Sequence, residues 1–440
     1  MDDLTAIVEA AWPVWLVLWA GWVTQAVLAA LLVRKFLHRR VMQGSFRVFD
    51  AHRPRAWVMV PFKGADDDLP AAIDALLTQD HDDYRLICIV ESEDDPAYPI
   101  LQRELARHSE AQTAGSAPDR VGGVVVAGRS PDDRGQKVHN LLKAIEHVDA
   151  DSDDSDVWVF ADSDAVPGPQ WLGKMIGPLG TEGVGVATGY RWLIPEAGAN
   201  IWSHLASVIN SSVACFMGRD KMNHAWGGSM AMQVSTAREG DLKGWLAGAI
   251  SDDYQVSRMC RHLGLSIHFV PECLVASPID LTRHDFFNFT HRQHLITRIY
   301  APWLFVGGIG VTGFYLFSFV TAWAMLGHYL YHDFDGGAWL IPLAAMLSVF
   351  TANLFRAHYR KQVIRCAFGT RIVQRMRRTL AIDRCLTPVC LGLHLLLLLR
   401  AALGRRIAWR GIEYQINAPQ DVRRLPPWRA GSVSDRPTEQ

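Results

Sequence analysis

The sequence predicts an α/β domain joined to an α-helical membrane module. Two observations predict this fold class. Between residues 57 and 161, short strand-like apolar runs alternate with helix-like runs. Outside that region, three stretches at 10–33, 301–327 and 336–355 are apolar over the roughly 20 residues needed to cross a bilayer. We therefore expect a water-soluble catalytic or binding domain that is held at a membrane.

The α/β alternation predicts a parallel sheet with crossover helices. Strands are expected at 57–61, 85–90, 124–127 and 157–161, and helices at 69–79, 96–107 and 137–148. In such sheets, ligands bind beyond the carboxyl ends of the strands. Side chains that follow the expected strands are therefore the first candidates for a functional site.

The first apolar stretch, 10–33, contains no charged residue and is followed by Arg34, Lys35, Arg39 and Arg40. A signal peptide carries its basic residues before the apolar region, whereas here they come after it. We predict that residues 1–40 form an N-terminal transmembrane anchor.

The second and third stretches predict a transmembrane hairpin over 299–356. The loop between them, 328–335, contains no Lys or Arg, whereas both flanks are basic. The positive-inside rule places that loop and the N-terminus outside, and residues 34–298 in the cytoplasm. We expect an integral protein of the bacterial inner membrane or an equivalent membrane, with a cytoplasmic catalytic domain.

A fourth apolar stretch, 385–399, is short, contains Pro388 and His394, and is basic at both ends. These features favour a re-entrant or in-plane segment, and a plain fourth span is the alternative. The basic run 356–384 predicts a helix on the inner membrane face, where anionic lipid attracts it. Residues 357–416 thus form an interfacial unit, and 417–440 a flexible tail.

Composition excludes several classes of protein. The 440 residues are 49% apolar and 20% charged, which is ample for a packed core and excludes a disordered chain. Lys and Arg total 44 against 45 Asp and Glu, so nothing suggests a nucleic-acid partner. The seven cysteines are odd in number and form no C-x-x-C pair, which argues against a disulfide framework or a zinc site.

Two carboxylate clusters follow expected strands. The first, Glu91, Glu93, Asp94 and Asp95, can accept hydrogen bonds from a base or ribose, and several of its members are equally suited to that role. In the second, 160–164, Asp162 and Asp164 project in similar directions, because side chains of an extended chain alternate with period two. Two hard oxygen ligands at that spacing suit Mg²⁺ or Mn²⁺ bridging a diphosphate.

Two further motifs lie closer to the second span. Asp252 and Asp253 stand near the start of an expected helix, where a carboxylate can act as a general base or simply cap the helix. The basic segment 289–298 is either a clamp on a departing diphosphate or a membrane-flanking collar.

The order of these clusters resembles family 2-type glycosyltransferases of the ceramide glucosyltransferase group, which includes hopanoid-associated enzymes. The matching segments are 60–66, 84–97, 135–140 (G-Q-K-V-H-N), 160–164 (F-A-D-S-D), 226–230 (W-G-G-S-M), 251–254 (S-D-D-Y) and 409–414 (W-R-G-I-E-Y). The resemblance covers about residues 10–416. It implies a GT-A, Rossmann-like domain over 41–298 and an inverting transfer of a hexose from a nucleotide sugar, expected to be UDP-linked.

The acceptor implied is a lipid hydroxyl such as that of ceramide or a hopanoid-type lipid, and the alternative is a processive polysaccharide synthase of the cellulose or hyaluronan type. Asp253 is the implied base, with Asp252 as second choice. The resemblance further implies metal ligands Asp162 and Asp164; nucleotide-sugar contacts Glu91, Glu93, Asp94, Lys137, Asp162, Gln293 and Arg298; and acceptor-side residues Trp226, Gly227, Gly228 and Ser229. Trp226 fits core packing equally well.

One motif departs from the family. In the family's Q-x-x-R-W sequence, Gln293 is present, but Ile296 and Thr297 occupy the Arg and Trp positions. Arg298 lies one residue further on, and we expect it to replace the missing cation. The departure weakens the polysaccharide-synthase alternative, in which the motif is usually retained.

Overall fold

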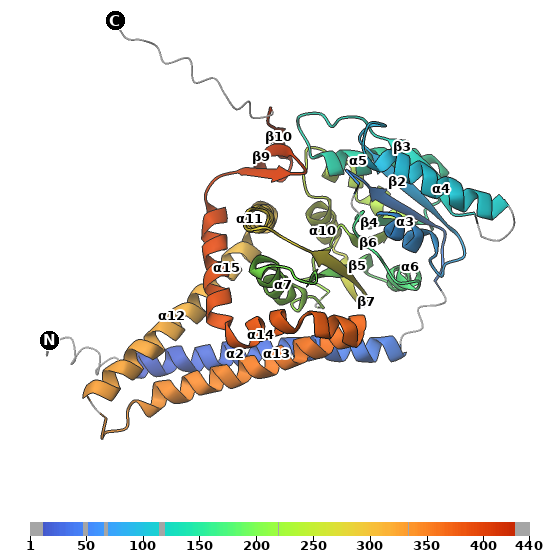
Figure 1. Cartoon of the computed structure of the whole chain (residues 1–440). Coiled ribbons are helices and arrows are strands. Elements are labelled where there is room, and N and C mark those ends of the chain that lie inside the picture. Colours follow the sequence, from blue (N-terminus) through green and yellow to red (C-terminus); the bar gives the residue numbers. More distant parts are fainter. Residues whose placement is uncertain are drawn as a thin grey trace, which may run out of the picture.

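The computed structural model describes residues 12–46, 52–65, 69–113, 119–218, 220–332 and 334–426. An α/β domain stands on one side of a group of long helices (Figure 1). The domain contains a seven-stranded sheet in the order β3-β2-β1-β4-β6-β5-β7. Its strands are β1 (Ala56–Pro61), β2 (Tyr84–Val90), β3 (Val121–Val126), β4 (Val157–Ala161), β5 (Val184–Pro195), β6 (Ser229–Gln233) and β7 (Ser266–Ile279).

The four strands expected from the sequence are confirmed, and their ends differ from the expectation by at most three residues. They pair in parallel, whereas β6 runs antiparallel to both β4 and β5. The sheet is therefore mixed: β6 alone runs against the other strands, because β5 is antiparallel to β6 and β7 is parallel to β5.

Successive side chains of a strand point to opposite faces of the sheet, where they pack into two separate hydrophobic cores. Val58 and Val60 of β1 belong to a cluster with α3 (Leu69–Leu77), α4 (Ala97–Thr113) and α6 (Trp171–Ile176). Met59 belongs to the opposite cluster, with α5 (Gln136–Val148), α8 (Val234–Glu239), α9 (Leu242–Leu246) and α10 (Asp252–His262). Each large apolar side chain buried in this way contributes about 1.5–3 kcal/mol. Packing in these two cores holds the strands in place, and with them the edge of the sheet at which the carboxylate motifs lie.

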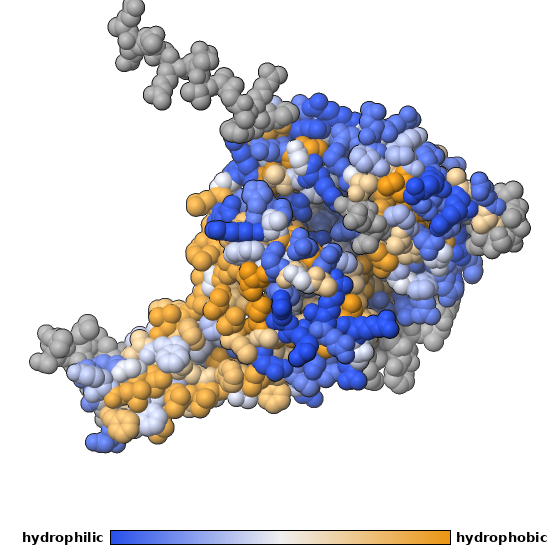
Figure 2. All heavy atoms as spheres, in the orientation of Figure 1, coloured by the Kyte–Doolittle hydropathy of each residue, from blue (hydrophilic) through white to orange (hydrophobic). Residues whose placement is uncertain are grey.

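Three helices in the described part of the chain are long and apolar enough to cross a membrane: α2 (Trp12–Phe46), α12 (Pro302–His332) and α13 (Leu340–Arg375). They extend away from the domain, and apolar side chains gather on their surface (Figure 2). Exposed examples are Val17, Leu28, Val306, Phe317, Val320, Trp323, Leu347 and Phe350. The rest of the visible surface is mostly hydrophilic.

The module and the domain share a core. Val33 and Phe36 of α2 pack with Trp192 of β5 and Phe269 of β7, and the Phe36 and Phe269 ring centroids are 5.5 Å apart. Val363 of α13 joins the same cluster. The inner ends of α2 and α13 thus support the strands directly.

The boundary expected at residue 356 falls inside a continuous helix. Helix α13 continues through it to Arg375, with a kink at Gly369, where φ is 83°. Arg356 and Arg360 are buried and bind Asp383 of α14 (Arg377–Cys385), so their side chains do not face lipid. A buried carboxylate partner makes it possible for these two cations to continue a packed helix.

Helix α14 and the following α15 (Thr387–Ala402) are bent by 89° relative to one another. Such a bend occurs in a re-entrant loop and in a broken span. It is therefore compatible with both interpretations of the fourth apolar stretch, a re-entrant segment or a fourth span. The other α-helices of the described residues are α7 (Ile201–Ala214) and α11 (Arg283–Tyr300), which leads into α12.

The expected flexible tail at 417–440 is wrong for its first part. A second sheet, in the order β10-β9-β8, consists of β8 (Arg406–Trp409), β9 (Ile412–Ala418) and β10 (Asp421–Arg424). Alternating apolar residues of β9, together with Val422, pack on Leu295 of α11, and this contact orders the segment. Residues 427–440 lie outside the described residues. All seven cysteines are free.

Candidate active site

Lys137 joins two of the predicted motifs. It is the second residue of α5, and its Nζ lies 2.8 Å from Asp162 Oδ1, just beyond β4. The same Nζ lies 3.2 Å from Asp252 Oδ2, at the first position of α10. In the structure this lysine holds the two carboxylates together, and its predicted contact with the nucleotide stays a prediction.

The three charges shift one another's pKa values. Burial opposes the charged form of Lys137, but Asp162 and Asp252 raise its pKa. Burial also opposes ionisation of Asp162, yet the charge of Lys137 and its hydrogen bond hold that pKa below the ordinary value. Burial raises the pKa of Asp252 to about 6, against the attraction of Lys137 and with help from Asp253. Negative charge is therefore in excess at this position.

The predicted metal ligands Asp162 and Asp164 lie beside one another. Asp164 is exposed to solvent on one side, yet desolvation by neighbouring atoms and the charge of Asp162 raise the pKa of its carboxyl group. Within the described residues, no group of three His, Cys, Asp or Glu side chains could hold a metal ion. Two carboxylates fit Mg²⁺ or Mn²⁺, because these ions take one or two from the protein and the remaining ligands from phosphates and water.

The predicted glycine turn packs against these carboxylates. A Cβ atom on Gly227 would stand 2.3 Å from Asp252 Oδ2, and one on Gly228 would stand 2.6 Å from Asp162 Oδ2. Only glycine lets the backbone approach so closely. The turn therefore shapes the floor of the site through its backbone.

The other two residues of the turn face inward. Ser229 accepts a hydrogen bond of 2.8 Å from the indole of Trp171 in the core. Trp226 is buried and packs with Tyr190, at a ring-centroid distance of 5.9 Å. Of the two interpretations of Trp226, core packing is the one observed.

Asp253 stands at the start of α10. Its Oδ1 accepts hydrogen bonds from the Ser251 hydroxyl and, at 2.8 Å, from the Tyr254 backbone N–H. Ser251 itself caps the helix, so capping does not require Asp253. The half-buried Asp253 carboxylate is thus oriented but not enclosed, as a general base must be.

The four carboxylates of the first motif lie in three different environments. Glu91 directly follows β2 and pairs with Lys63, which follows β1, so both lie at the carboxyl edge of the sheet. Glu93 and Asp94 are exposed. Asp95 is buried and accepts two backbone N–H bonds, at 2.8 and 3.0 Å, from the turn after β1 and the start of α4. Asp95 is therefore structural, and Glu91 is the member that directly follows the strand at the carboxyl edge of the sheet.

Two arginines that the sequence did not single out accompany the carboxylates. Arg191 of β5 lies over Phe289, 5.2 Å from its ring centroid, and Arg292 of α11 lies over the same ring at 5.8 Å. Both charges help lower the pKa of Asp162. Burial, Arg191 and Arg410 lower the pKa of Arg292 to about 10. Arg292 was visible in the basic motif, but Arg191 had no local signal.

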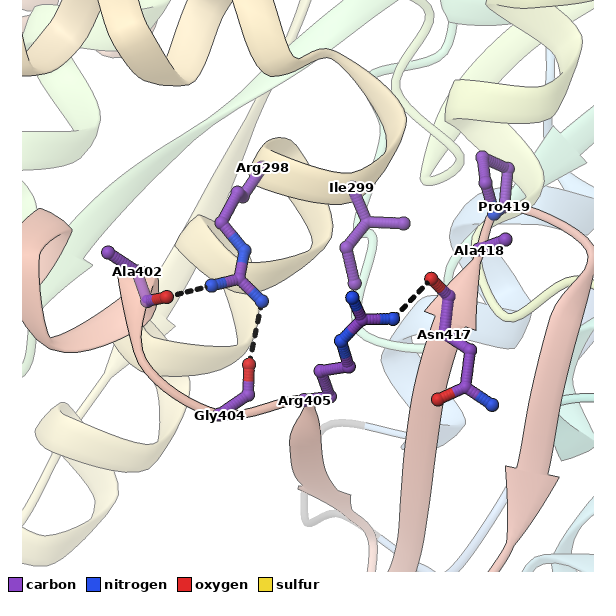
Figure 3. A pocket seen from close by; sticks show the side chains of 8 residues that line it. All are labelled: Arg298, Ile299, Ala402, Gly404, Arg405, Asn417, Ala418 and Pro419. Carbon is purple, nitrogen blue, oxygen red and sulfur yellow. Dashed lines mark hydrogen bonds between the residues drawn. The ribbon is translucent and has the colours of Figure 1, made fainter.

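Arg298 does not lie with Arg191 and Arg292 beside the carboxylates. Its guanidinium donates to the carbonyl oxygens of Ala402 and, at 2.6 Å, Gly404 (Figure 3). Together with Arg405, it lines a separate open hollow of about 540 Å³ between α11, α15 and β9. Gln293 is half-buried on α11, and its backbone carbonyl accepts a bond of 2.8 Å from Thr297.

A mixed sheet with a carboxylate pair beyond β4 and facing cations is the arrangement of a GT-A glycosyltransferase. The chain belongs to glycosyl transferase family 21, whose family model matches residues 17–422. This confirms the resemblance seen in the motifs and shows that the protein is a glycosyltransferase. Comparison with curated proteins gave no match.

Two solved structures illustrate the likeness. A mannosyltransferase from Pyrobaculum calidifontis, in complex with GDP-Man and Mn²⁺, is 13% identical, with a TM-score of 0.44 over 88% of this chain and 97% of that one. Glucosyl-3-phosphoglycerate synthase from Mycobacterium tuberculosis, with Mn²⁺ and UDP-glucose, is 18% identical, with a TM-score of 0.30 over 55% of this chain and 75% of that one.

Proposed function

We propose that this glycosyltransferase is membrane-bound and moves a hexose, with inversion, from a UDP-linked sugar to the hydroxyl of a membrane lipid. Ceramide and hopanoid-type lipids are the classes of acceptor that fit a hydroxyl presented at a bilayer surface. The catalytic domain would act on the cytoplasmic leaflet.

One observation carries the lipid acceptor: the candidate base is tied to the start of a spanning helix. Tyr254, next to Asp253, shares a hydrogen bond of 2.9 Å with Thr297 of α11. Three residues later α11 ends, and α12 begins at Pro302. The ring of His224 lies 5.5 Å from Tyr254 and 5.7 Å from the half-exposed Trp303 of α12. A lipid headgroup beside α12 would therefore lie close to Asp253.

The roles follow from the contacts. Asp253 would accept the proton of the acceptor hydroxyl as that oxygen attacks the anomeric carbon from the side opposite the diphosphate. Lys137 would hold Asp162 and Asp252 in position, while Arg191 and Arg292 bind phosphate oxygens. A divalent cation on Asp162 and Asp164 would neutralise the leaving diphosphate.

The test is product analysis. Purified protein in nanodiscs is incubated with Mn²⁺, a panel of UDP- and GDP-sugars and a membrane lipid extract, and the lipids are analysed by mass spectrometry. We expect one hexose on one lipid class. The transfer rate of the Asp253→Asn variant should be about 10²–10⁴-fold lower, while the variant still binds the donor. Asp280→Asn, an exposed carboxylate, is the matched control.

Two outcomes contradict the proposal. A water-soluble polymer as the product would favour the processive synthase instead. Normal transfer by the Asp253→Asn variant would show that another group removes the proton.

A further inference from the structure

The turn between β8 and β9 has an unusual first residue. Trp409 pairs with Ile412, so the turn consists of Arg410 and Gly411 alone. Both have positive φ, 46° and 78°. A two-residue hairpin turn with this geometry favours Asn-Gly, because asparagine and glycine tolerate the left-handed region. An arginine there costs backbone energy, and such strain is characteristic of functional positions.

The C-terminal sheet that carries this turn is fastened to both helices of the site. The Tyr414 hydroxyl of β9 accepts a hydrogen bond of 3.2 Å from the backbone N–H of Gln136, the neighbour of Lys137. On the other side, His291 Nε2 lies 3.2 Å from the carbonyl oxygen of Arg406, beside Arg292. The sheet therefore bridges α5 and α11 (Figure 1).

Arg410 lies on a sheet that contacts the sequence neighbours of both Lys137 and Arg292. The charge of Arg410 and that of Arg191 both help lower the pKa of Arg292, so the three guanidinium groups lie within electrostatic reach of one another. Three neighbouring cations repel one another and are stabilised by an anion between them.

We infer that Arg410 binds the diphosphate of the nucleotide sugar together with Arg191 and Arg292, and so replaces the cation missing from the Q-x-x-R-W motif. The inference rests on the proposed function, since it takes a nucleoside diphosphate as the ligand. A guanidinium can donate two parallel hydrogen bonds to phosphate oxygens, which suits this ligand. The C-terminal sheet then forms one wall of the donor site.

The decisive variant is Arg410→Asn. Asparagine suits the turn better than arginine does, so the melting temperature should stay equal or rise. Loss of hydrogen bonds to a charged ligand should weaken UDP binding by about 10- to 100-fold, while uridine binding stays unchanged. Isothermal titration of the full chain in detergent with Mn²⁺, using UDP, GDP and uridine, measures both. Arg423→Asn, which removes an exposed arginine from β10 of the same sheet, is the matched control.

Equal UDP affinity in Arg410→Asn and in the wild type would overturn this inference alone. Failure of the wild type to bind either nucleoside diphosphate would instead overturn the proposed function, and the inference with it. Should Arg410→Asn lose its fold, Arg410→Gly provides the same turn geometry and must show the same selective loss of UDP affinity.

Discussion

Two buried ion clusters in this molecule are built in opposite ways. The carboxylate cluster of the site places one cation between two carboxylates: Lys137, Asp162 and Asp252. The arginine cluster beneath the domain places one carboxylate between two cations: Arg356, Arg360 and Asp383. Each has one charge in excess, negative in the first and positive in the second.

Their surroundings differ more than their charges do. In the arginine cluster, Arg360 Nη1 lies 2.6 Å from Asp383 Oδ1, and its Nη2 donates to the Ser212 hydroxyl at 2.9 Å. Arg356 Nη2 donates to Asp383 and, at 3.0 Å, to Thr387. Protein groups from four helices, α7, α13, α14 and α15, thus enclose this cluster and are joined by it.

The carboxylate cluster has no such enclosure. Glycines instead of hydroxyls stand against Asp162 and Asp252, and Asp164 opens to solvent beside them. The difference teaches that the charges of the arginine cluster join helices through protein partners, whereas the carboxylate cluster faces glycine backbone and solvent and is accessible to a ligand. The comparison makes predictions for both clusters.

The largest effect is expected for Asp383→Asn. This change leaves two buried arginines without a carboxylate, which should cost about 3–5 kcal/mol in the free energy of unfolding. Chemical unfolding in detergent, followed by tryptophan fluorescence, measures the loss. Asp335→Asn, in an exposed loop, should change stability by no more than about 0.5 kcal/mol.

Asp162→Asn sharpens the contrast. It leaves Lys137 with Asp252 as a partner, so we expect a smaller loss of stability than in Asp383→Asn, together with loss of transfer. If Asp162→Asn destabilises the protein as strongly as Asp383→Asn does, the carboxylate cluster is needed for stability as much as the arginine cluster is. The contrast between the two clusters would then be wrong.

The sequence predicted the regular half of the fold. Strands such as 157–161 are short buried apolar runs, and their period and length identify them without tertiary information. The same holds for the carboxylates that follow them, because parallel strands bring their ends to one edge. Asp162 and Asp164 follow β4 in this way. Asp252 begins a helix and the glycine turn precedes the antiparallel β6, so only the family resemblance linked them to Asp162 before the structure placed them together.

The parts that were missed depend on long-range packing. Arg191 reaches the site only because β5 pairs with the antiparallel β6 and the parallel β7, and no local pattern indicates that order. Arg298 was chosen for its proximity in sequence, yet on α11 it points to the carbonyls at the end of α15. Strand β10 and the last two residues of β9 were assigned to a tail because Val422 packs with Leu295, far away in the chain.

The next effect concerns the open side of the carboxylate cluster. Asp164→Asn should lower sugar transfer by about 100-fold at limiting Mn²⁺, because a metal contributes several kcal/mol to a leaving diphosphate. A Mn²⁺ titration of initial rates should show a higher concentration for half-maximal activity. Undiminished turnover by the wild type after treatment with a chelator would contradict the metal role of Asp162 and Asp164.

Gly227→Ala tests the close backbone approach. The added methyl group would stand 2.3 Å from Asp252 Oδ2 and 2.9 Å from Lys137 Nζ, so the ion pair must move. Overpacking of this kind costs about 1–3 kcal/mol, and we expect transfer to fall more than stability does. Gly307→Ala in α12, which meets nothing within 4 Å, is the matched control and should leave both unchanged. If Gly227→Ala matches Gly307→Ala in both transfer activity and stability, the turn can accommodate a methyl group at residue 227.

The smallest effect is a pH dependence at Asp252. Burial raises its pKa to about 6 in the folded protein, against an ordinary value near 3.9 in the unfolded chain. The folded state therefore binds more protons between about pH 4 and 6, so the stability contributed by this residue falls as pH rises through that window. Asp252→Asn cannot ionise and escapes the loss. In metal-free buffer without donor, the melting temperature of the variant minus that of the wild type should rise from pH 4 to 6 and then level off, whereas a flat difference would show that Lys137 fully compensates the buried charge.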